Sequence, residues 1–163
     1  MSTMKQTSIH RRQTGFSLVE VLITLVIMSV GMLGIAGLYV QSMQAGRTSM
    51  FRHHAVTLAG DVADRIRANP TADIAYTALV GVDNNCVLGG IDCTPVQMAA
   101  NDILLWKDQA TNTLPGGDVT IVLTPEAGLV PPTYQITISW TEPGQVPAPT
   151  YTITVPVLAD LDL

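Results

Sequence analysis

A long apolar stretch near the N-terminus constrains this chain more than any other feature of its sequence. From Val21 to Gly46 no residue is charged, and about 20 consecutive apolar residues suffice for a helix to cross a bilayer. Lys5, Arg11 and Arg12 precede the stretch, so the positive-inside rule places residues 1–15 in the cytoplasm. We therefore expect a single transmembrane helix, with the C-terminal region outside the inner membrane.

One carboxylate lies near the start of this apolar run. On a basic start and an apolar run alone, an ordinary signal peptide or signal anchor would be the simpler interpretation. The hydrophobic part of a signal peptide is uninterrupted and about 7–15 residues long, whereas this run is longer and contains Glu20. A charged side chain at the centre of a membrane helix costs about 2.5–3.5 kcal/mol on insertion scales. We therefore expect Glu20 to have a partner.

The segment GFSLVEVL, residues 15–22, resembles the class III signal sequence of type IV pilins and type II secretion pseudopilins. The resemblance implies that prepilin peptidase cleaves the chain between Gly15 and Phe16 and that the same enzyme N-methylates Phe16. It also implies an assembly role for Glu20, which matches the glutamate at the fifth position of the mature family sequence. Residues 1–15 are then a leader peptide.

The apolar pattern continues past the membrane segment with helical spacing. Apolar residues recur mostly three or four positions apart, with charged residues between them, at Met43, Phe51, Ala55, Leu58, Val62 and Ile66. Asn69-Pro70 should end the helix, because the residue before proline avoids the helical conformation. The expected helix thus covers 16–69, with a membrane and assembly half (16–46) and an amphipathic half (47–69). Gly31, Gly34 and Gly37 are either a close-packing surface or weak points in the helix.

Residues 70–163 are expected to form a small periplasmic domain with a loop, a short helix and a sheet. The short helix is predicted between Pro95 and Gln109, where Met98, Ile103, Leu105 and Trp106 alternate with Asp102 and Asp108. Three alternating segments then predict strands around residues 119–123, 134–140 and 151–157. The fold class is therefore α+β and pilin-like, with the long N-terminal helix packed on a small antiparallel sheet.

The distal region resembles PilV-type minor pilins in the short helix ending at Trp106, the following Leu-Pro-Gly-Gly turn and the strand end ISWTE, residues 138–142. This resemblance implies a role in the minor-pilin complex that initiates and caps type IV pilus assembly. The implied partners are prepilin peptidase, other minor pilins, the major pilin, a pilus-tip adhesin and the inner-membrane assembly platform. The implied location is the inner membrane, as a single-pass protein, followed by the extracellular pilus.

Two other functions fit parts of the sequence. An I-type pseudopilin of a type II secretion system would share the N-terminal motif, but those proteins are generally shorter and the extra loop with Cys86 and Cys93 favours a pilus subunit. A DNA-uptake pilin would bind nucleic acid directly. Beyond Asn69, however, Lys107 is the only base, against ten Asp and Glu side chains, and phosphate binding depends on Lys and Arg. We therefore expect no nucleic-acid partner.

The two cysteines of the chain, Cys86 and Cys93, are close in sequence. In an oxidising periplasm we expect them to form a disulfide rather than a metal site, because zinc needs four ligands and no histidine is nearby. His53-His54 is expected on a solvated or partner-facing helix surface, and Asp83-Asn84-Asn85 is expected in a turn rather than in a calcium loop. No catalytic motif is evident, so we expect neither an enzyme nor a cofactor.

Overall fold

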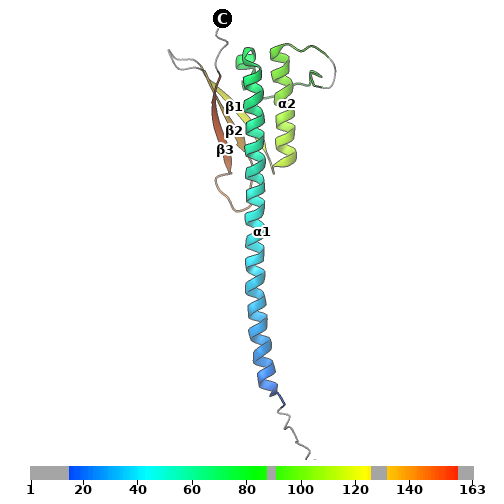
Figure 1. Ribbon diagram of the computed structural model, residues 1–163, viewed down its shortest axis with the longest axis vertical. Helices are drawn as coiled ribbons and strands as arrows, with labels where there is room; N and C mark the ends of the chain where they lie inside the picture. Colours follow the sequence, from blue (N-terminus) through cyan, green and yellow to red (C-terminus); the bar gives the residue numbers. More distant parts are fainter. Residues whose placement is uncertain (1–14, 88–90, 126–131, 158–163) are drawn as a thin grey trace, which may run out of the picture. The chain divides into compact units, whose positions relative to one another are not determined.

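A computed structural model of the protein describes residues 15–87, 91–125 and 132–157. The chain divides into two compact units, one ending at Gln44 and the other beginning at Ala45. Helix α1 (Leu18–Ala68) contributes its first part to the first unit and its second part to the other (Figure 1). The predicted leader lies outside the described residues except for Gly15. The predicted helix bounds, 16–69, agree with α1 to within two residues.

The first part of α1 is apolar and exposed. Every residue from 15 to 47 is exposed within the described protein. A window of this helix reaches a mean hydropathy of 2.5 with none of its residues buried, and by length and composition the helix can cross a membrane. Single exposed apolar residues are common on protein surfaces, but a continuous apolar surface of this kind marks a membrane or protein contact.

The second part of α1 has one buried face. Its buried residues recur three or four positions apart, as the sequence pattern predicts, and they are Ala55, Leu58, Ala59, Val62, Ala63 and Ile66. Arg65 and Arg67 lie in the last turn, where positive charge interacts favourably with the helix dipole. The helix ends before Asn69-Pro70, as expected from the restriction that proline places on the preceding residue.

A 3₁₀ helix, η1 (Pro70–Thr77), follows directly and was not predicted from the sequence, which indicated a loop here. Proline occupies its first turn, where the missing N–H costs nothing. Its Ala72 and Tyr76 side chains are buried, so packing rather than helical periodicity holds this short element. Asp73 has a positive φ of 43° inside η1, a conformation that non-glycine residues rarely adopt.

Helix α2 (Pro95–Thr113) confirms the predicted short helix and extends it by one turn. Thr94 caps it: its side chain accepts a hydrogen bond from the Gln97 N–H at 3.3 Å, and the Gln97 side chain accepts one from the Thr94 N–H at 3.0 Å. The Leu-Pro-Gly-Gly turn follows, with Gly116 at φ 59°. The expected apolar face was partly wrong, since Leu105 is 41% exposed and Asp102 is 2% exposed.

The sheet contains three antiparallel strands in the order β1-β2-β3: β1 (Asp118–Thr124), β2 (Thr133–Ser139) and β3 (Thr150–Pro156). Ile136 pairs with Ile121 on one side and with Ile153 on the other. Apolar side chains face the core and mostly threonine or other polar side chains face solvent, because side chains alternate along a strand. All three predicted strands are confirmed.

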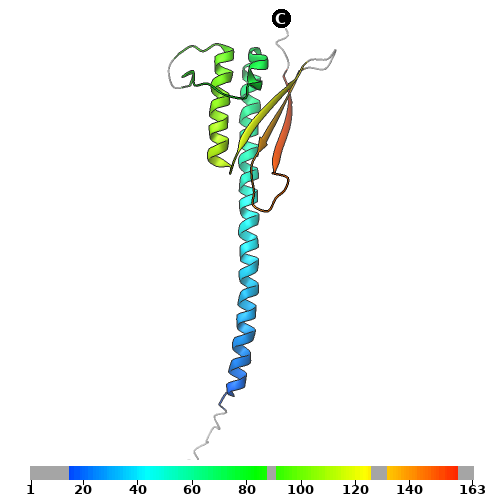
Figure 2. The ribbon, with the colours of Figure 1, turned by 180° about the vertical axis from the view of Figure 1, so that it is seen from behind.

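The core of the second unit lies between the sheet and the helices. In both ribbon views the sheet and α2 flank the second part of α1 (Figure 1, Figure 2). Trp106 and Tyr76 are fully buried and their rings stack with centroids 5.7 Å apart. The Trp106 indole N–H donates to Asp61 at 2.9 Å, and this hydrogen bond links α2 to α1.

A buried carboxylate joins three elements of this unit. Arg65 of α1 donates to Asp102 of α2 at 2.7 Å, and the hydroxyl of Tyr76 in η1 lies 3.4 Å from the other carboxylate oxygen. So short an ion pair normally lowers the pKa of a carboxyl group, but here burial has the larger effect and raises the pKa of Asp102, with Arg65 offsetting part of the rise. Burial also raises the pKa of Tyr76 to about 12. Arg65 therefore stabilises the charged form of the buried Asp102 carboxylate.

We predict that Arg65→Leu lowers the free energy of unfolding by about 2–3 kcal/mol at pH 7, because it leaves the Asp102 carboxylate buried and unpaired. The loss should shrink toward pH 4. With its folded-state pKa raised further, Asp102 binds a proton more readily in the folded than in the unfolded chain, so its charge opposes folding only as pH rises above the unfolded value near 4.

Denaturant unfolding of the full chain in detergent, followed by Trp106 and Trp140 fluorescence, measures this effect. Arg67→Leu is the matched control, because its ion pair with Asp64 is exposed and should contribute less than about 1 kcal/mol. An Arg65→Leu loss that is independent of pH would contradict the role assigned to the buried carboxylate.

Candidate processing and assembly site

The predicted cleavage junction lies immediately before α1. Gly15, Phe16 and Ser17 are outside any helix or strand, and Phe16 is 83% exposed. A Cβ atom added at Gly15 would meet no atom within 4 Å. Within the described protein, the peptide bond between Gly15 and Phe16 is therefore open to an enzyme, and the glycine is not required by packing.

The first turn of α1 brings Glu20 close to this junction. The Ser17 carbonyl accepts hydrogen bonds from the N–H groups of Glu20 and Val21, and its hydroxyl lies 3.4 Å from the Val19 N–H. Ser17 thus caps the helix, as serine commonly does. Glu20 is exposed in the first turn, where the N-terminal dipole stabilises a carboxylate by about 0.3–1 kcal/mol. None of the ion pairs among the described residues involves Glu20.

The three glycines of the apolar part lie in regular helix. At Gly31, Gly34 and Gly37, an added Cβ atom would meet no neighbour within 4 Å. Neither sequence interpretation of these glycines, as a packing surface or as weak points, is tested by a single chain.

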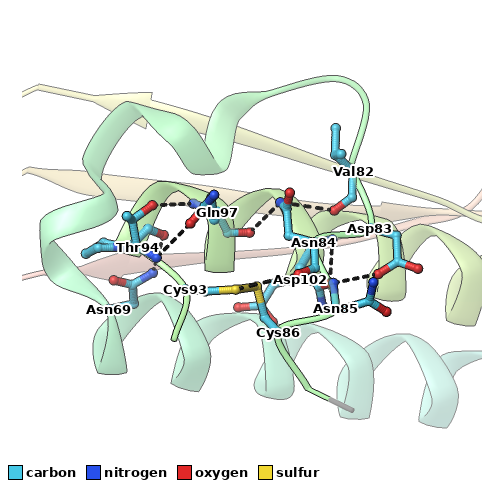
Figure 3. Close-up of a disulfide and its surroundings, with 12 residues drawn as sticks. Asn69, Val82, Asp83, Asn84, Asn85, Cys86, Cys93, Thr94, Gln97 and Asp102 are labelled. Carbon is cyan, nitrogen blue, oxygen red and sulfur yellow. Dashed lines mark hydrogen bonds between the residues drawn. A yellow bond between two sulfur atoms is a disulfide. The ribbon is translucent and has the colours of Figure 1, made fainter. Parts of the chain in front are cut away.

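The expected disulfide between Cys86 and Cys93 is present. Figure 3 shows it beside the N-terminus of α2, where Cys93 directly precedes the capping residue Thr94. The Asp83-Asn84-Asn85 segment leads into it, and the Asn85 N–H donates to the Asp83 carboxylate at 2.9 Å, which closes an Asx turn just before the backbone turn at residues 86–87. The disulfide therefore ties this turn to the start of α2.

Side-chain amides hold the same connection to the helices around it. Asn84 donates from its side chain to the Gln97 carbonyl at 3.0 Å and from its backbone to the Asn101 side chain at 3.2 Å. Asn69, at the end of α1, donates to the Pro95 carbonyl at 2.9 Å. The η1–α2 connection is thus fixed by one covalent bond and by hydrogen bonds to α2, with α2 itself bonded to the end of α1 (Figure 3).

A second polar cluster, which could not be read from the sequence, links the β2–β3 connection to α1 near the start of the second unit. The Glu142 carboxylate accepts hydrogen bonds from the Trp140 indole at 2.7 Å and from the Thr48 hydroxyl at 2.8 Å, and Gln145 donates to it at 3.0 Å. The spacing of Trp140 and Glu142 on the sequence gives no signal for this contact, because Thr48 is 94 residues from Glu142.

The described residues offer little for metal or catalytic chemistry. Among residues 15–87, 91–125 and 132–157, no group of three or more His, Cys, Asp and Glu side chains could hold a metal ion. His53 is exposed and His54 is half-buried on α1. The buried carboxylate of Asp102 bonds to the half-buried Arg65 of α1 and to Tyr76 of η1, which assigns these residues to the fold.

Two comparisons with known families match adjacent parts of the chain. Residues 10–36 match the prokaryotic N-terminal methylation motif, and residues 37–104 match the family described as Tt1218-like, type IV pilin Tt1218. Together they support a type IV pilin, a class of structural proteins, without singling out the PilV type. No curated protein and no solved structure gives a significant match.

We predict that removing the disulfide, by Cys86→Ser with Cys93→Ser, lowers the free energy of unfolding by about 2–3 kcal/mol. In the chain-entropy model a bridge spanning a sequence separation of 7 restricts only a short loop of the unfolded chain. Denaturant unfolding of both forms under non-reducing conditions measures the difference. In the native protein neither thiol should react with an alkylating reagent, and full alkylation without reductant would contradict the bridge.

Proposed function

We propose that this type IV pilin is a minor pilin of the PilV type, which joins other minor pilins in the complex that initiates and caps a pilus. Prepilin peptidase cleaves it between Gly15 and Phe16 and methylates the new Phe16 amine. Before assembly it spans the inner membrane once, with residues 70–163 in the periplasm. The observation that carries the proposal is Glu20, which lies in the first turn of an exposed apolar helix directly after the Gly15-Phe16 junction.

The apolar part of α1 supports both a membrane stage and an assembled stage. Its exposed side chains include Leu33 at 74% and Tyr39 at 70%, so this surface needs an apolar environment outside the described chain. Lipid supplies that environment before assembly, and the helices of neighbouring pilins supply it afterwards. Further partners follow from this role: the major pilin, a pilus-tip adhesin and the inner-membrane assembly platform.

Charge pairing explains how Glu20 would direct assembly. After cleavage, each subunit has a protonated secondary amine at Phe16 and a carboxylate four residues further on. The helix dipole alone does not offset the cost of Glu20 in lipid. Opposite charges ~4 Å apart at an effective dielectric near 20 attract by about 4 kcal/mol before desolvation is subtracted. A neighbouring subunit's amine would therefore stabilise Glu20 and set the axial register of the two helices.

The first prediction of this proposal concerns the N-terminus of the mature protein. Mass spectrometry of the mature protein should find methylated Phe16 as its first residue. Gly15→Glu should leave the full-length precursor in the membrane, because the larger charged side chain obstructs the peptidase. Since nothing within 4 Å restricts a Cβ at Gly15, this variant tests the enzyme's requirement and not the fold. A mature N-terminus elsewhere, such as near Ala45, would contradict the proposal.

The second prediction concerns Glu20. We expect Glu20→Ala to insert and to be cleaved normally but to co-purify with partner pilins in reduced yield, and to lower pilus number in a strain without the wild-type copy. Glu20→Gln should behave like Glu20→Ala, because the proposed contact requires the charge.

Ser29→Ala is the matched control for these variants. Ser29 is another exposed polar residue of the same helix, and its hydroxyl only donates to the Val26 carbonyl at 2.8 Å. It should leave partner recovery unchanged. Normal recovery and normal piliation with Glu20→Ala would remove Glu20 from the mechanism and leave the apolar helix surfaces to direct assembly.

A further inference from the structure

Strand β3 forms an open edge of the sheet. It pairs with β2 on one side, and no described strand pairs with it on the other. The opposite edge strand, β1, lies close to both η1 and α2. In Figure 1 and Figure 2, β3 is the strand at the outer side of the sheet.

The register shows which backbone groups β3 presents at this edge. The Trp140 N–H donates to the Pro149 carbonyl and the Val157 N–H to the Pro132 carbonyl. Both pairs lie in the same register as Ile136 and Ile153 and an even number of residues away from them. Hydrogen-bonded and non-hydrogen-bonded pairs alternate along an antiparallel ladder, so Ile136 and Ile153 are also a hydrogen-bonded pair. Tyr151, Ile153 and Val155 therefore bond to β2. The N–H and C=O groups of Thr150, Thr152 and Thr154 point away from the sheet.

This edge lacks the features that usually protect an edge strand. Natural edges carry charged side chains, bulges or early prolines that discourage pairing with another chain. Strand β3 has the sequence TYTITVP, with no charge and with its proline only at the last position. Its register with β2 is continuous from Thr150 to Pro156, without a bulge. The edge therefore has a continuous register and no charged side chain.

The core-facing side of β3 is also incompletely covered. Its neighbours on β2, Ile136 and Ile138, are both 0% exposed. On β3 itself, Tyr151 and Ile153 are only partly buried. Because β3 is the edge strand, an added strand would lie beside these two residues, and it would extend both the hydrogen-bond ladder and the apolar side of the sheet.

We propose that β3 binds an extended strand from a different protein subunit, which extends the sheet by one strand. The partner segment would place apolar residues beside Tyr151 and Ile153 and, at alternate positions, uncharged polar residues beside the exposed threonines. Backbone hydrogen bonds would supply affinity and the alternate side chains specificity, as in other cases of strand addition.

A second copy of this chain does not fit the same edge. The β1 edge lies close to η1 and α2, which leaves β3 as the open edge through which two copies would meet. Antiparallel pairing would point residues 45–68 of α1, which run alongside the strands (Figure 2), in opposite directions in the two copies. The ends at residue 45, which lead into the apolar segment, would then lie at opposite ends of the pair, and this disfavours the pairing of two chains anchored in one membrane. Parallel pairing about an axis along the strands would place Ile153 of one copy beside the threonine face of the other. The exclusion of the antiparallel pair rests on the membrane anchoring in the proposed function.

The test is site-specific photo-cross-linking in cells that make the full-length chain and its pilus proteins. A benzophenone amino acid is placed at Thr150, Thr152 or Thr154, one at a time, and the attachment points are mapped by mass spectrometry. The expected result is one segment of another subunit, in which the attachment point moves two residues for each step along β3. Thr120 and Thr137 are matched controls on the same sheet face away from the edge, and should not give this ladder.

Two proline variants separate the edge contact from folding. Thr152→Pro removes an N–H that points outward, which edge strands tolerate, so it should keep its unfolding midpoint while the cross-links from Thr154 are lost. Ile153→Pro removes an N–H bonded to β2 and should destabilise the protein. If Thr152→Pro also destabilises it, Thr152→Lys places a charge at the edge instead and should likewise abolish the cross-links.

Scattered or missing attachment points, cross-links between two copies of this chain, or a ladder that survives both Thr152 variants would overturn the proposal. The N-terminus of the same samples is read by mass spectrometry. A normally processed chain without a ladder would refute the strand contact alone, whereas an unprocessed chain with a ladder would refute the proposed function and leave the contact standing.

Discussion

Removal of the apolar half of α1 from water is the requirement on which the other properties of this protein depend. Residues 15–47 are exposed throughout, although the segment from Val21 to Gly46 contains no charge. Apolar burial stabilises by roughly 25 cal/mol per Å², and the described chain provides no such burial for this segment. The helix therefore needs lipid or other helices, and in the proposed function the single carboxylate at its start, Glu20, is the group that selects the neighbouring subunit.

The apolar face of the second half of α1 is removed from water by the chain itself. From Ala55 to Ile66 one face is buried by the chain's own sheet and helices, and Arg65 and Asp61 on the neighbouring face bond to side chains of α2. Polar contacts inside a core require complete satisfaction, and no buried side-chain nitrogen or oxygen among the described residues lacks a hydrogen-bond partner. These contacts fix the positions of η1 and α2, and with them the disulfide-linked connection.

The sequence predicted those elements whose signal is local. The long helix, the short helix, the three strands and the disulfide follow from periodicity, proline positions and cysteine spacing, and all are present. Element η1 was missed because its stability comes from burying Ala72 and Tyr76, which no short-range pattern records. Asp102 was counted as polar surface, although it lies three residues after Ala99 and four before Trp106, on the face that is buried. That spacing could have predicted its burial, but not its bond to Arg65, 37 residues away.

The most direct test of the account is zero-length carbodiimide coupling in membranes that contain this chain and its partner pilins, followed by mass spectrometry. Carbodiimide joins a carboxylate to an amine only when the two are in contact. We predict an amide bond between Glu20 and the N-terminal amine of a neighbouring pilin, and the loss of this bond in Glu20→Ala. If Glu20 couples to no amine, or only to lysine side chains, while the subunits still co-purify, pairing of Glu20 with a neighbouring N-terminus does not direct assembly.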